Sequence, residues 1–489
     1  MRSRPRSRLA GYLGATLAPV VIGVVALPVG PVFPGAPASP PLVAAETVGL
    51  TLTPAAEAQA VYDRMRPAQR IGQLFMVGGP VTGIGSATRT AISAYHVGNL
   101  ILTGRTTAGA TSVRYIAGRA DTLTTTSATA GVPLFIASDQ EGGYVQVLQG
   151  PGFSRMPTAL TQGTWSDTTL TAYARTWGTQ VMRSGVDVDL APVMDTVAKS
   201  FASLNQPIGH YQREYGYTPS VVADKGTAFL KGMQASGLAM TAKHFPGLGR
   251  VTGNTDTTAG VTDTVTTRTS ADITPFRDAV NTGAHLLMVS SAYYARIDAS
   301  HPAVFSPTII RGMIRGDLGF SGIVISDDLG NAKQLAAWSP GARAVGFISA
   351  GGDVVLTVNP SVIPAMVNAV TARAASDSVF RGRVQAAVLR VLTVKARYGL
   401  LSPRLPVTGS FGALTKTALQ RWLGITQTGV FDSATIRSLQ ARIGAPVVGV
   451  WGPRSMAAMQ SYLGLYLDGA TTWNTRTVAG LQRYLNTQL

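Results

Sequence analysis

Short runs of apolar residues recur between about residues 60 and 400, and each run ends in polar residues. The runs are Gln73–Gly78, Val97–Thr103, Pro133–Asp139, Asp187–Val193, Leu238–Phe245, His285–Ser291, Gly322–Asp327 and Asp353–Thr357. Their length and composition predict buried strands. Segments with the apolar period of an amphipathic helix lie between them, and these include Ala108–Thr125, Thr168–Ser184, Pro219–Ser236 and Ile273–Gly283.

This alternation of strands and helices predicts parallel strands that are joined by helical crossovers. Eight such units over about 340 residues favour an α/β fold, a closed (β/α)8 barrel of the TIM type. An open doubly wound sheet is the alternative. It is less favoured, because no Gly-x-Gly-x-x-Gly segment opens the first helix, where such a sheet would bind phosphate.

The chain beyond residue 407 has a different pattern, which repeats every twenty residues. Glycines recur at Gly409, Gly429, Gly449 and Gly469, and glutamines recur at Gln420, Gln440, Gln460 and, slipped by two positions, Gln482. Each unit ends in a short amphipathic segment, such as Leu414–Leu423 or Ala434–Ile443. One such helix cannot bury its own apolar face, so the four units are predicted to pack together. We therefore expect a small all-α repeat domain over 408–489, after a linker at 402–407. The alternative is a helical appendage that merely packs on the barrel.

The first residues have the pattern of a secretory signal peptide. Residues 1–8 contain four arginines and no acid, and residues 9–29 are almost wholly apolar. Small residues at Ala36 and Ala38 offer a cleavage site, and Val43-Ala44-Ala45 is a second candidate. The first site predicts a leader over 1–38, a linker over 39–56 and the barrel over 57–401. An uncleaved membrane anchor is the alternative, because about 20 apolar residues can span a bilayer. The sequence thus predicts a secreted or cell-wall-associated protein, with no membrane contact after cleavage.

The amino-acid composition excludes several kinds of catalytic and metal site and indicates which polymers the protein would bind. The 41 Lys and Arg residues outnumber the 24 Asp and Glu residues, which gives a net charge of +17. An exported chain this basic would meet anionic cell-wall polymers rather than nucleic acid. The absence of cysteine excludes disulfides, thiolate zinc sites and cysteine nucleophiles. With only 5 histidines, no metal site is expected, and no cofactor is predicted.

Charged residues gather at three of the predicted strand ends, in Ser138–Gly143, Lys243–Gly249 and Ser326–Leu329. The C-terminal ends of the strands of a parallel barrel meet at one mouth, so these carboxylates would converge beside a lysine and a histidine. Retaining glycosidases need such a set, because one carboxylate attacks the anomeric carbon and a proton donor serves the leaving oxygen. For any single aspartate, a helix cap is the alternative role.

Taken together, these stretches resemble glycoside hydrolase family 3, in its bacterial β-N-acetylglucosaminidase branch. Asp139-Gln140-Glu141-Gly142-Gly143, Lys243-His244-Phe245-Pro246-Gly247 and Ser326-Asp327-Asp328-Leu329 occur in the family's order and at its approximate spacing. Ala191–Asp195 and the segment from Gln206 to Arg213 are similar to further family landmarks. The tail is similar to peptidoglycan-binding repeats of the three-helix type.

The resemblance implies a role for each matching residue. Asp327 would be the nucleophile, which forms a covalent glycosyl-aspartate intermediate. Asp139, Lys243 and His244 would bind sugar hydroxyls, and Arg213 would contact the substrate as well.

The sequence departs from the family pattern where the resemblance places the acid/base. The family has a histidine there, oriented by an aspartate, whereas this chain has Asp256 and Asn254, and Leu248 replaces a second motif histidine. Two interpretations stay open. Asp256 is itself the acid/base, if burial or the charge of Asp327 raises its pKa. Otherwise catalysis is impaired, and the barrel binds glycan without cleaving it.

The sequence therefore predicts an exported retaining exo-β-N-acetylglucosaminidase that acts on peptidoglycan or its fragments, with the tail holding it on the wall. One alternative is a catalytically impaired wall-binding or scaffolding protein. Another is a family 3 β-glycosidase of other sugar specificity, which Tyr144 and Asn331 favour because the family usually has arginine and methionine there. Hydrolysis and phosphorolysis of the intermediate are both compatible with these residues.

Overall fold

The computed structural model describes residues 53–401, 405 and 407–486. The predicted leader over 1–38 lies outside the described residues, as do most positions of the linkers 39–56 and 402–407. Among the helices of the described residues, none has the length and apolar character needed to cross a membrane.

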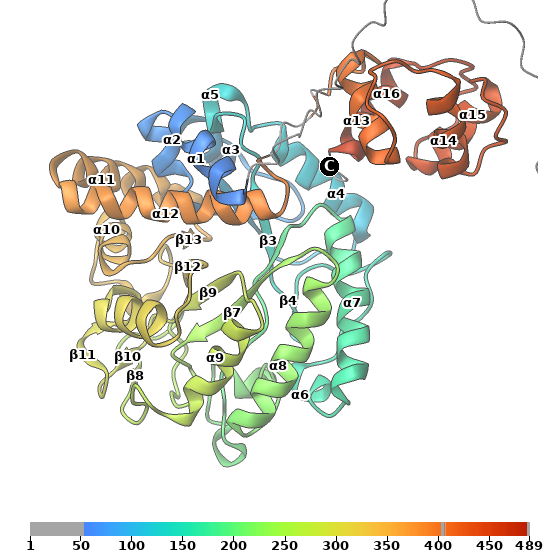
Figure 1. Ribbon diagram of the computed structural model, residues 1–489. Helices are drawn as coiled ribbons and strands as arrows, with labels where there is room; N and C mark the ends of the chain where they lie inside the picture. Colours follow the sequence, from blue (N-terminus) through green and yellow to red (C-terminus); the bar gives the residue numbers. More distant parts are fainter. Residues whose placement is uncertain (1–52, 402–404, 406, 487–489) are drawn as a thin grey trace, which may run out of the picture. The chain divides into compact units, whose positions relative to one another are not determined.

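Eight parallel strands form a barrel, and consecutive strands lie side by side (Figure 1). They are β1 (Phe75–Pro80), β2 (Asn99–Thr103), β3 (Phe135–Ser138), β6 (Val188–Asp189), β7 (Ala239–Phe245), β9 (Leu286–Val289), β12 (Ile323–Ser326) and β13 (Val355–Thr357). β1 pairs with both β2 and β13, and a parallel bridge between Ile325 and Val354 joins the two ends of the sheet. Seven of the apolar runs contain one of these strands and the run Gln73–Gly78 overlaps β1, so the predicted (β/α)8 barrel is confirmed.

Helices surround the strands (Figure 1). They are α1 (Pro54–Arg64), α2 (Pro67–Gly72), α3 (Ser86–Ala94), α4 (Gly109–Asp121), α5 (Thr126–Thr129), α6 (Ala159–Gln162), α7 (Asp167–Arg183), α8 (Pro219–Gln234), α9 (Thr274–Asn281), α10 (Pro340–Ala350), α11 (Ile363–Ser376) and α12 (Ser378–Arg397). A π-helical segment, Thr308–Asp317, stands between β9 and β12. Local sequence sets the helix starts: Ser166 and Thr218 cap α7 and α8, because their side chains accept backbone N–H groups of the first turn.

Helix α12 closes the N-terminal end of the barrel. Its buried Lys395 donates hydrogen bonds to the Gln73 side chain and to the carbonyls of Gly98 and Pro133, at the starts of β1, β2 and β3. Nearby, Val391 and Val394 belong to the same buried apolar cluster as residues of the strands. The opposite, C-terminal end of the barrel is the end at which loops can form a site.

Two small β structures grow out of the loops at this end. The hairpin of β4 (Gln140–Gly142) and β5 (Val145–Gln146) follows β3. A second sheet combines β8 (Thr262–Asp263), β10 (Tyr293–Tyr294) and β11 (Asp298–Pro302), from the loops after β7 and β9.

The tail contains four helices that all run in the same direction. They are α13 (Ala413–Leu423), α14 (Ser433–Ile443), α15 (Pro453–Tyr462) and α16 (Thr475–Leu485). The aromatic residues that lie two positions before each helix contact one another, and they are Phe411, Phe431, Trp451 and Trp473. Residues of the last turns also meet, and they are Trp422, Arg442, Tyr462 and Tyr484. The predicted packing of four units into an all-α domain is confirmed.

The repeated glutamines join each unit of the tail to the next. Gln420 donates to the Val430 carbonyl at 2.8 Å and accepts the Gly429 N–H at 2.8 Å. Gln440 makes the same two bonds to the third unit, whereas Gln460 donates to the Thr477 hydroxyl and the Asp468 carboxylate of the fourth unit and accepts the Asp468 N–H. Gln482 accepts the N–H of Gly409 at 2.9 Å, so the fourth unit binds back to the first. The four units therefore form a closed ring.

We expect the substitution Gln440→Leu to destabilise the tail by about 2 kcal/mol, because it leaves buried backbone groups without partners. The free energy of opening of α13–α16, measured by native-state hydrogen exchange, reports this loss. Gln427→Leu is the matched control, because Gln427 is an exposed glutamine of the same domain. Equal effects of the two substitutions would show that the buried amide does not hold the ring.

Candidate active site

The structure places the candidate residues at the C-terminal mouth of the barrel. Asp139 directly follows β3, and Asp327 directly follows β12. Lys243 and His244 end β7. The two remaining candidates lie in loops: Arg213 lies between β6 and α8, and Asp256 lies in the loop after β7.

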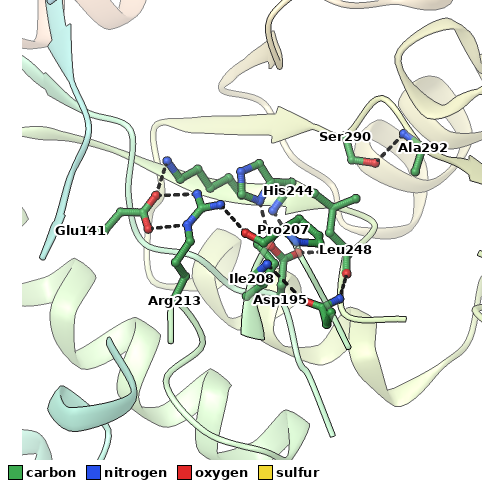
Figure 2. Close-up of polar contacts among 12 residues, drawn as sticks. Glu141, Asp195, Pro207, Ile208, Arg213, His244, Leu248, Ser290 and Ala292 are labelled. Atoms are coloured by element: carbon green, nitrogen blue, oxygen red, sulfur yellow. Dashed lines mark hydrogen bonds and ion pairs between the residues drawn. The ribbon is translucent and has the colours of Figure 1, made fainter. Parts of the chain in front are cut away.

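Four of the side chains at this mouth form one ionic network, and Figure 2 shows the pair of Glu141 and Arg213 within it. Lys243 Nζ lies 2.7 Å from Asp139 Oδ1 and 2.7 Å from Glu141 Oε1. Arg213 donates two hydrogen bonds to Glu141, at 2.9 and 2.7 Å, and a third to the Pro207 carbonyl at 2.8 Å. This network joins the hairpin after β3 to β7 and to the loop after β6.

Opposite charges within this network offset the effect of burial on the pKa values of Glu141 and Lys243. Burial alone would raise the pKa of Glu141, but the charges and hydrogen bonds of Arg213 and Lys243 outweigh burial and lower that pKa to about 2. Burial likewise acts to lower the pKa of Lys243, whereas Asp139 and Glu141 raise it to about 12. Glu141 and Lys243 are therefore both ionised at neutral pH.

Only two members of the network are accessible from the mouth. The side chains of Asp139 and Arg213 are 28% and 17% exposed, whereas those of Lys243 and Glu141 are 3% and 4% exposed. Asp139 and Arg213 can therefore contact a ligand. The buried Glu141 pairs with both cations, Lys243 and Arg213. Sequence reasoning assigned no role to Glu141, although it stands inside a motif that was singled out.

His244 is oriented by a buried carboxylate (Figure 2). Asp195 is fully buried, and its Oδ2 lies 2.8 Å from His244 Nδ1. Its Oδ1 accepts the backbone N–H groups of His244 and Leu248, at 3.2 and 2.9 Å. Because Nδ1 is engaged, Nε2 is left for a ligand. The sequence marked Asp195 as a landmark, but its orienting contact was missed.

Asp327 and Asp328 have different surroundings although they are adjacent. Asp327 is half-buried, and its Oδ1 accepts the Asp328 N–H at 2.9 Å. Asp328 is buried, and its carboxylate accepts the N–H groups of Gly330, Asn331 and Val358 at 2.9–3.1 Å. Asp328 thus shapes the loop, while Asp327 remains accessible to a ligand.

The loop that carries Asp256 is bonded to the segment that follows Asp327. The carbonyl of Asp256 accepts the Lys333 N–H at 3.1 Å, and the carbonyl of Thr255 accepts the Gln334 N–H at 3.0 Å. The buried Gln334 side chain also bonds both backbone groups of Val261, at 2.9 and 3.0 Å. These bonds fix Asp256 relative to the chain of Asp327.

The pKa of Asp256 is raised above its usual range. The residue as a whole is exposed, yet protein atoms around its carboxyl group displace water from it and raise its pKa to about 7. The charges of Asp327 and Asp328 raise it further, while those of His244 and Arg213 act in the opposite direction. The charges of Asp327, His244 and Arg213 are thus close enough to act on the carboxyl group of Asp256.

Asn254 stabilises the turn that carries Asp256. Its Oδ1 accepts the Asp256 N–H at 2.9 Å, and its carbonyl accepts the N–H groups of Thr257 and Thr258 at 3.1 and 2.8 Å. It therefore positions the main chain rather than a catalytic ring. Across the described residues, no group of three or more His, Asp or Glu side chains is arranged to hold a metal ion.

Comparison with known proteins identifies the same family over the barrel. The profile described as the N-terminal domain of glycosyl hydrolase family 3 matches residues 68–394. A β-hexosaminidase of Stenotrophomonas maltophilia (strain K279a) is 33% identical over 283 residues, which are 56% of this chain and 82% of that protein. A β-hexosaminidase of Xylella fastidiosa (strain 9a5c) is 33% identical over 290 residues, which are 56% and 82% of the two chains.

Solved structures give the same result. The β-N-acetylhexosaminidase of Beutenbergia cavernae DSM 12333 is 48% identical, with a TM-score of 0.67, and the match covers 68% of this chain and 99% of that one. A family 3 β-N-acetylglucosaminidase of Paenibacillus sp. str. FPU-7 is 27% identical, with a TM-score of 0.62, over 70% and 64% of the two chains. The tail lies outside the region that the family profile matches.

The buried carboxylate of Glu141 should make stability depend on acidity. Its pKa is about 2 in the folded chain and about 4.5 when the chain unfolds, so its contribution is complete above pH 4.5 and is lost as the pH falls towards 2. We expect a loss of ~3 kcal/mol from this group. In the variant Glu141→Gln, that part of the pH dependence should disappear, as measured by urea unfolding between pH 7 and pH 3.

Asp167→Asn is the matched control, because the Asp167 side chain, which pairs with Lys225, is 59% exposed. It should change the free energy of unfolding by less than about 1 kcal/mol. A pH dependence in Glu141→Gln that equals that of the unmodified chain would contradict the assignment.

Proposed function

The chain belongs to glycosyl hydrolase family 3 and is a β-N-acetylhexosaminidase-like hydrolase, and from this premise we propose a more specific activity. We infer an exported retaining exo-β-N-acetylglucosaminidase that acts on peptidoglycan or its fragments. The single observation that carries the catalytic part is an accessible carboxylate, Asp327, beside a carboxyl group with a raised pKa, Asp256.

Asp327 and Asp256 divide the chemistry between them. Asp327 attacks the anomeric carbon and forms a glycosyl ester, while Asp256 gives its proton to the leaving oxygen. Asp256, now a carboxylate, then takes a proton from water, whose oxygen attacks the anomeric carbon and releases Asp327. Two displacements at one carbon retain the β configuration.

The ionic network holds the sugar during both steps. Asp139 accepts hydrogen bonds from sugar hydroxyls, and Arg213 donates to hydroxyl oxygens, while the buried Lys243 holds the Asp139 carboxylate in place. His244 contributes Nε2, because Asp195 engages its other nitrogen. These groups fix the sugar ring so that its anomeric carbon faces Asp327. Little further entropy is then lost when the bound sugar reacts.

The bonding of the Asp256 loop supports catalysis rather than binding alone. A carboxyl group needs a pKa near the working pH to serve both as acid and as base. Burial and Asp327 give Asp256 such a pKa, and Gln334 and Lys333 hold its main chain. The chain therefore has a substitute for the histidine of the family pattern.

We propose that the tail ring holds the enzyme on the cell wall. Residues 408–489 contain seven Lys and Arg residues and two acidic residues, Asp432 and Asp468. This positive balance favours binding to anionic polymers. The aromatic rings ahead of its helices are only half-buried, so they offer surfaces to a glycan. Tethering raises the local concentration of substrate without changing the active site.

We expect Asp256→Ala to slow cleavage of unactivated chitobiose about a hundredfold or more, while activated dinitrophenyl glycosides are cleaved at a similar rate in the first step. The reason is that a good leaving group departs without a proton. Steady-state rates and burst amplitudes on the two substrates measure the difference. Asp224→Ala, at an exposed aspartate of α8, is the matched control and should leave both rates unchanged.

The same variant carries a second readout. In the unmodified enzyme, kcat/KM should fall as the pH rises above about 7, because Asp256 must carry a proton. That fall should vanish in Asp256→Ala. Unchanged cleavage of chitobiose by the variant would reject Asp256 as the acid, and complete inactivity of the unmodified chain on N-acetylglucosaminides would reject the proposed function.

Deletion of residues 405–489 should abolish binding to isolated cell-wall sacculi and leave turnover of aryl glycosides intact. The barrel has its own apolar core, which contains no tail residue, so its activity should survive the deletion. Co-sedimentation with sacculi and turnover of an aryl glycoside measure the two properties on the same preparation. Full retention of binding would remove the anchoring role from the tail.

A further inference from the structure

Two exposed aromatic rings meet at the mouth of the barrel, outside the groups that hold the first sugar. Tyr144 is 56% exposed and Tyr211 is 41% exposed. Their ring centroids lie 5.9 Å apart, in an edge-on arrangement. Large apolar side chains are rarely left in water next to each other without a reason, so this pair suggests a contact surface.

The chain places this pair beside the accessible members of the ionic network. Tyr144 lies at the tip of the β4–β5 hairpin, three positions beyond Glu141. Tyr211 lies two positions before Arg213. Since Glu141 and Arg213 are joined by two hydrogen bonds and the two tyrosine rings are in contact, the ion pair and the rings stand next to each other.

Both tyrosines stand on fixed supports. The hairpin tip approaches Thr158 so closely that a Cβ on Gly143 would lie 2.5 Å from its methyl carbon. On the other side, Gln212 accepts a hydrogen bond from the same Thr158 hydroxyl at 3.2 Å. The guanidinium of Arg105, from the loop after β2, donates to the Tyr144 carbonyl. The main chain that carries the two rings is thus held before any ligand arrives, which lowers the entropy lost on binding.

The ring of His210 extends the aromatic surface, because it packs edge-on against Tyr211 at 4.8 Å. Pyranose rings have an apolar face of C–H groups, which an aromatic face can cover while the hydroxyl groups stay hydrogen-bonded at the ring's edge. The exposed tyrosine rings stand next to the ion pair of Glu141 and Arg213 and therefore suit a sugar ring better than a wholly apolar partner, because the hydroxyl groups of a sugar can bond to polar neighbours.

We propose that Tyr144 and Tyr211 form an additional subsite, which stacks a second pyranose ring of an oligosaccharide next to the sugar held by Asp139 and Arg213. The proposal rests on the proposed function, because it assumes that an amino sugar occupies the neighbouring position. It adds that the two tyrosines determine how strongly chain length affects binding. Binding energy from this second ring is available only to substrates that possess it.

The test uses the full-length chain with the substitution Asp327→Asn, so that ligands are bound without turnover. Calorimetry then gives the affinity for N-acetylglucosamine, its β-1,4-linked dimer and its trimer. We expect affinity to rise with length, and Tyr144→Ala combined with Tyr211→Ala to weaken binding of the trimer about tenfold while changing that of the monosaccharide less than twofold. Tyr115→Ala is the matched control, because Tyr115 is 68% exposed on α4, away from the mouth.

The substitutions Tyr144→Phe and Tyr211→Phe keep the rings and should retain trimer binding, which a contribution from the hydroxyl groups alone would not allow. An equal loss for the monosaccharide and the trimer would overturn the proposal, since the tyrosines would then only support the first pocket. Affinity that does not depend on chain length would overturn it as well. Failure of the proposed function shows separately, as absence of turnover by the chain with Asp327 intact.

Discussion

The mouth of the barrel depends on one buried carboxylate, that of Glu141. It accepts bonds from Arg213 and Lys243, which come from the loop after β6 and from β7, while Glu141 itself lies on the hairpin after β3. Burying three charges is costly unless they are paired, so each of these segments is held in position by the other two. Removal of any member would leave an uncompensated charge beneath the site. This arrangement also fixes the positions of Asp139 and Arg213, the two members that a ligand can reach.

A second constraint links the two carboxyl groups that would carry the chemistry. Asp327 and Asp256 belong to different loops, and a proton donor is useful only at a fixed distance from the nucleophile. The chain joins the loops by main-chain hydrogen bonds and by the buried amide of Gln334. The same proximity sets the charge state, because Asp327 is among the groups that raise the pKa of Asp256. The bonds between the two loops therefore set both the position of Asp256 and its raised pKa.

The barrel and the tail are both closed rings, but different interactions join their units. In the barrel, main-chain pairing runs through all strands and returns to the first through β13. In the tail, short helices cannot pair main chains, and buried glutamines bond each unit to the loop of the next. Their amides both donate and accept, so one side chain satisfies the carbonyl and the N–H groups of a tight loop.

Local pattern determined much of this protein from the sequence alone. Apolar runs located every barrel strand, helical periodicity located α4, α7, α8 and α9, and the twenty-residue repeat located the tail helices. The motifs placed Asp139, Lys243, His244 and Asp327 at strand ends. These features are short-range, because each depends on neighbours within a few residues. The catalytic roles of these residues stay predictions.

Only the tertiary structure decided which side chains meet. Glu141 pairs with Arg213 across 72 positions, Asp195 orients His244 across 49, and Gln482 closes the tail on a unit 73 positions earlier. The pKa of Asp256 depends on burial and on charges brought from other loops. Pairings of this kind leave no periodic trace in the sequence, because the chain between the partners is free to vary while the contact is kept.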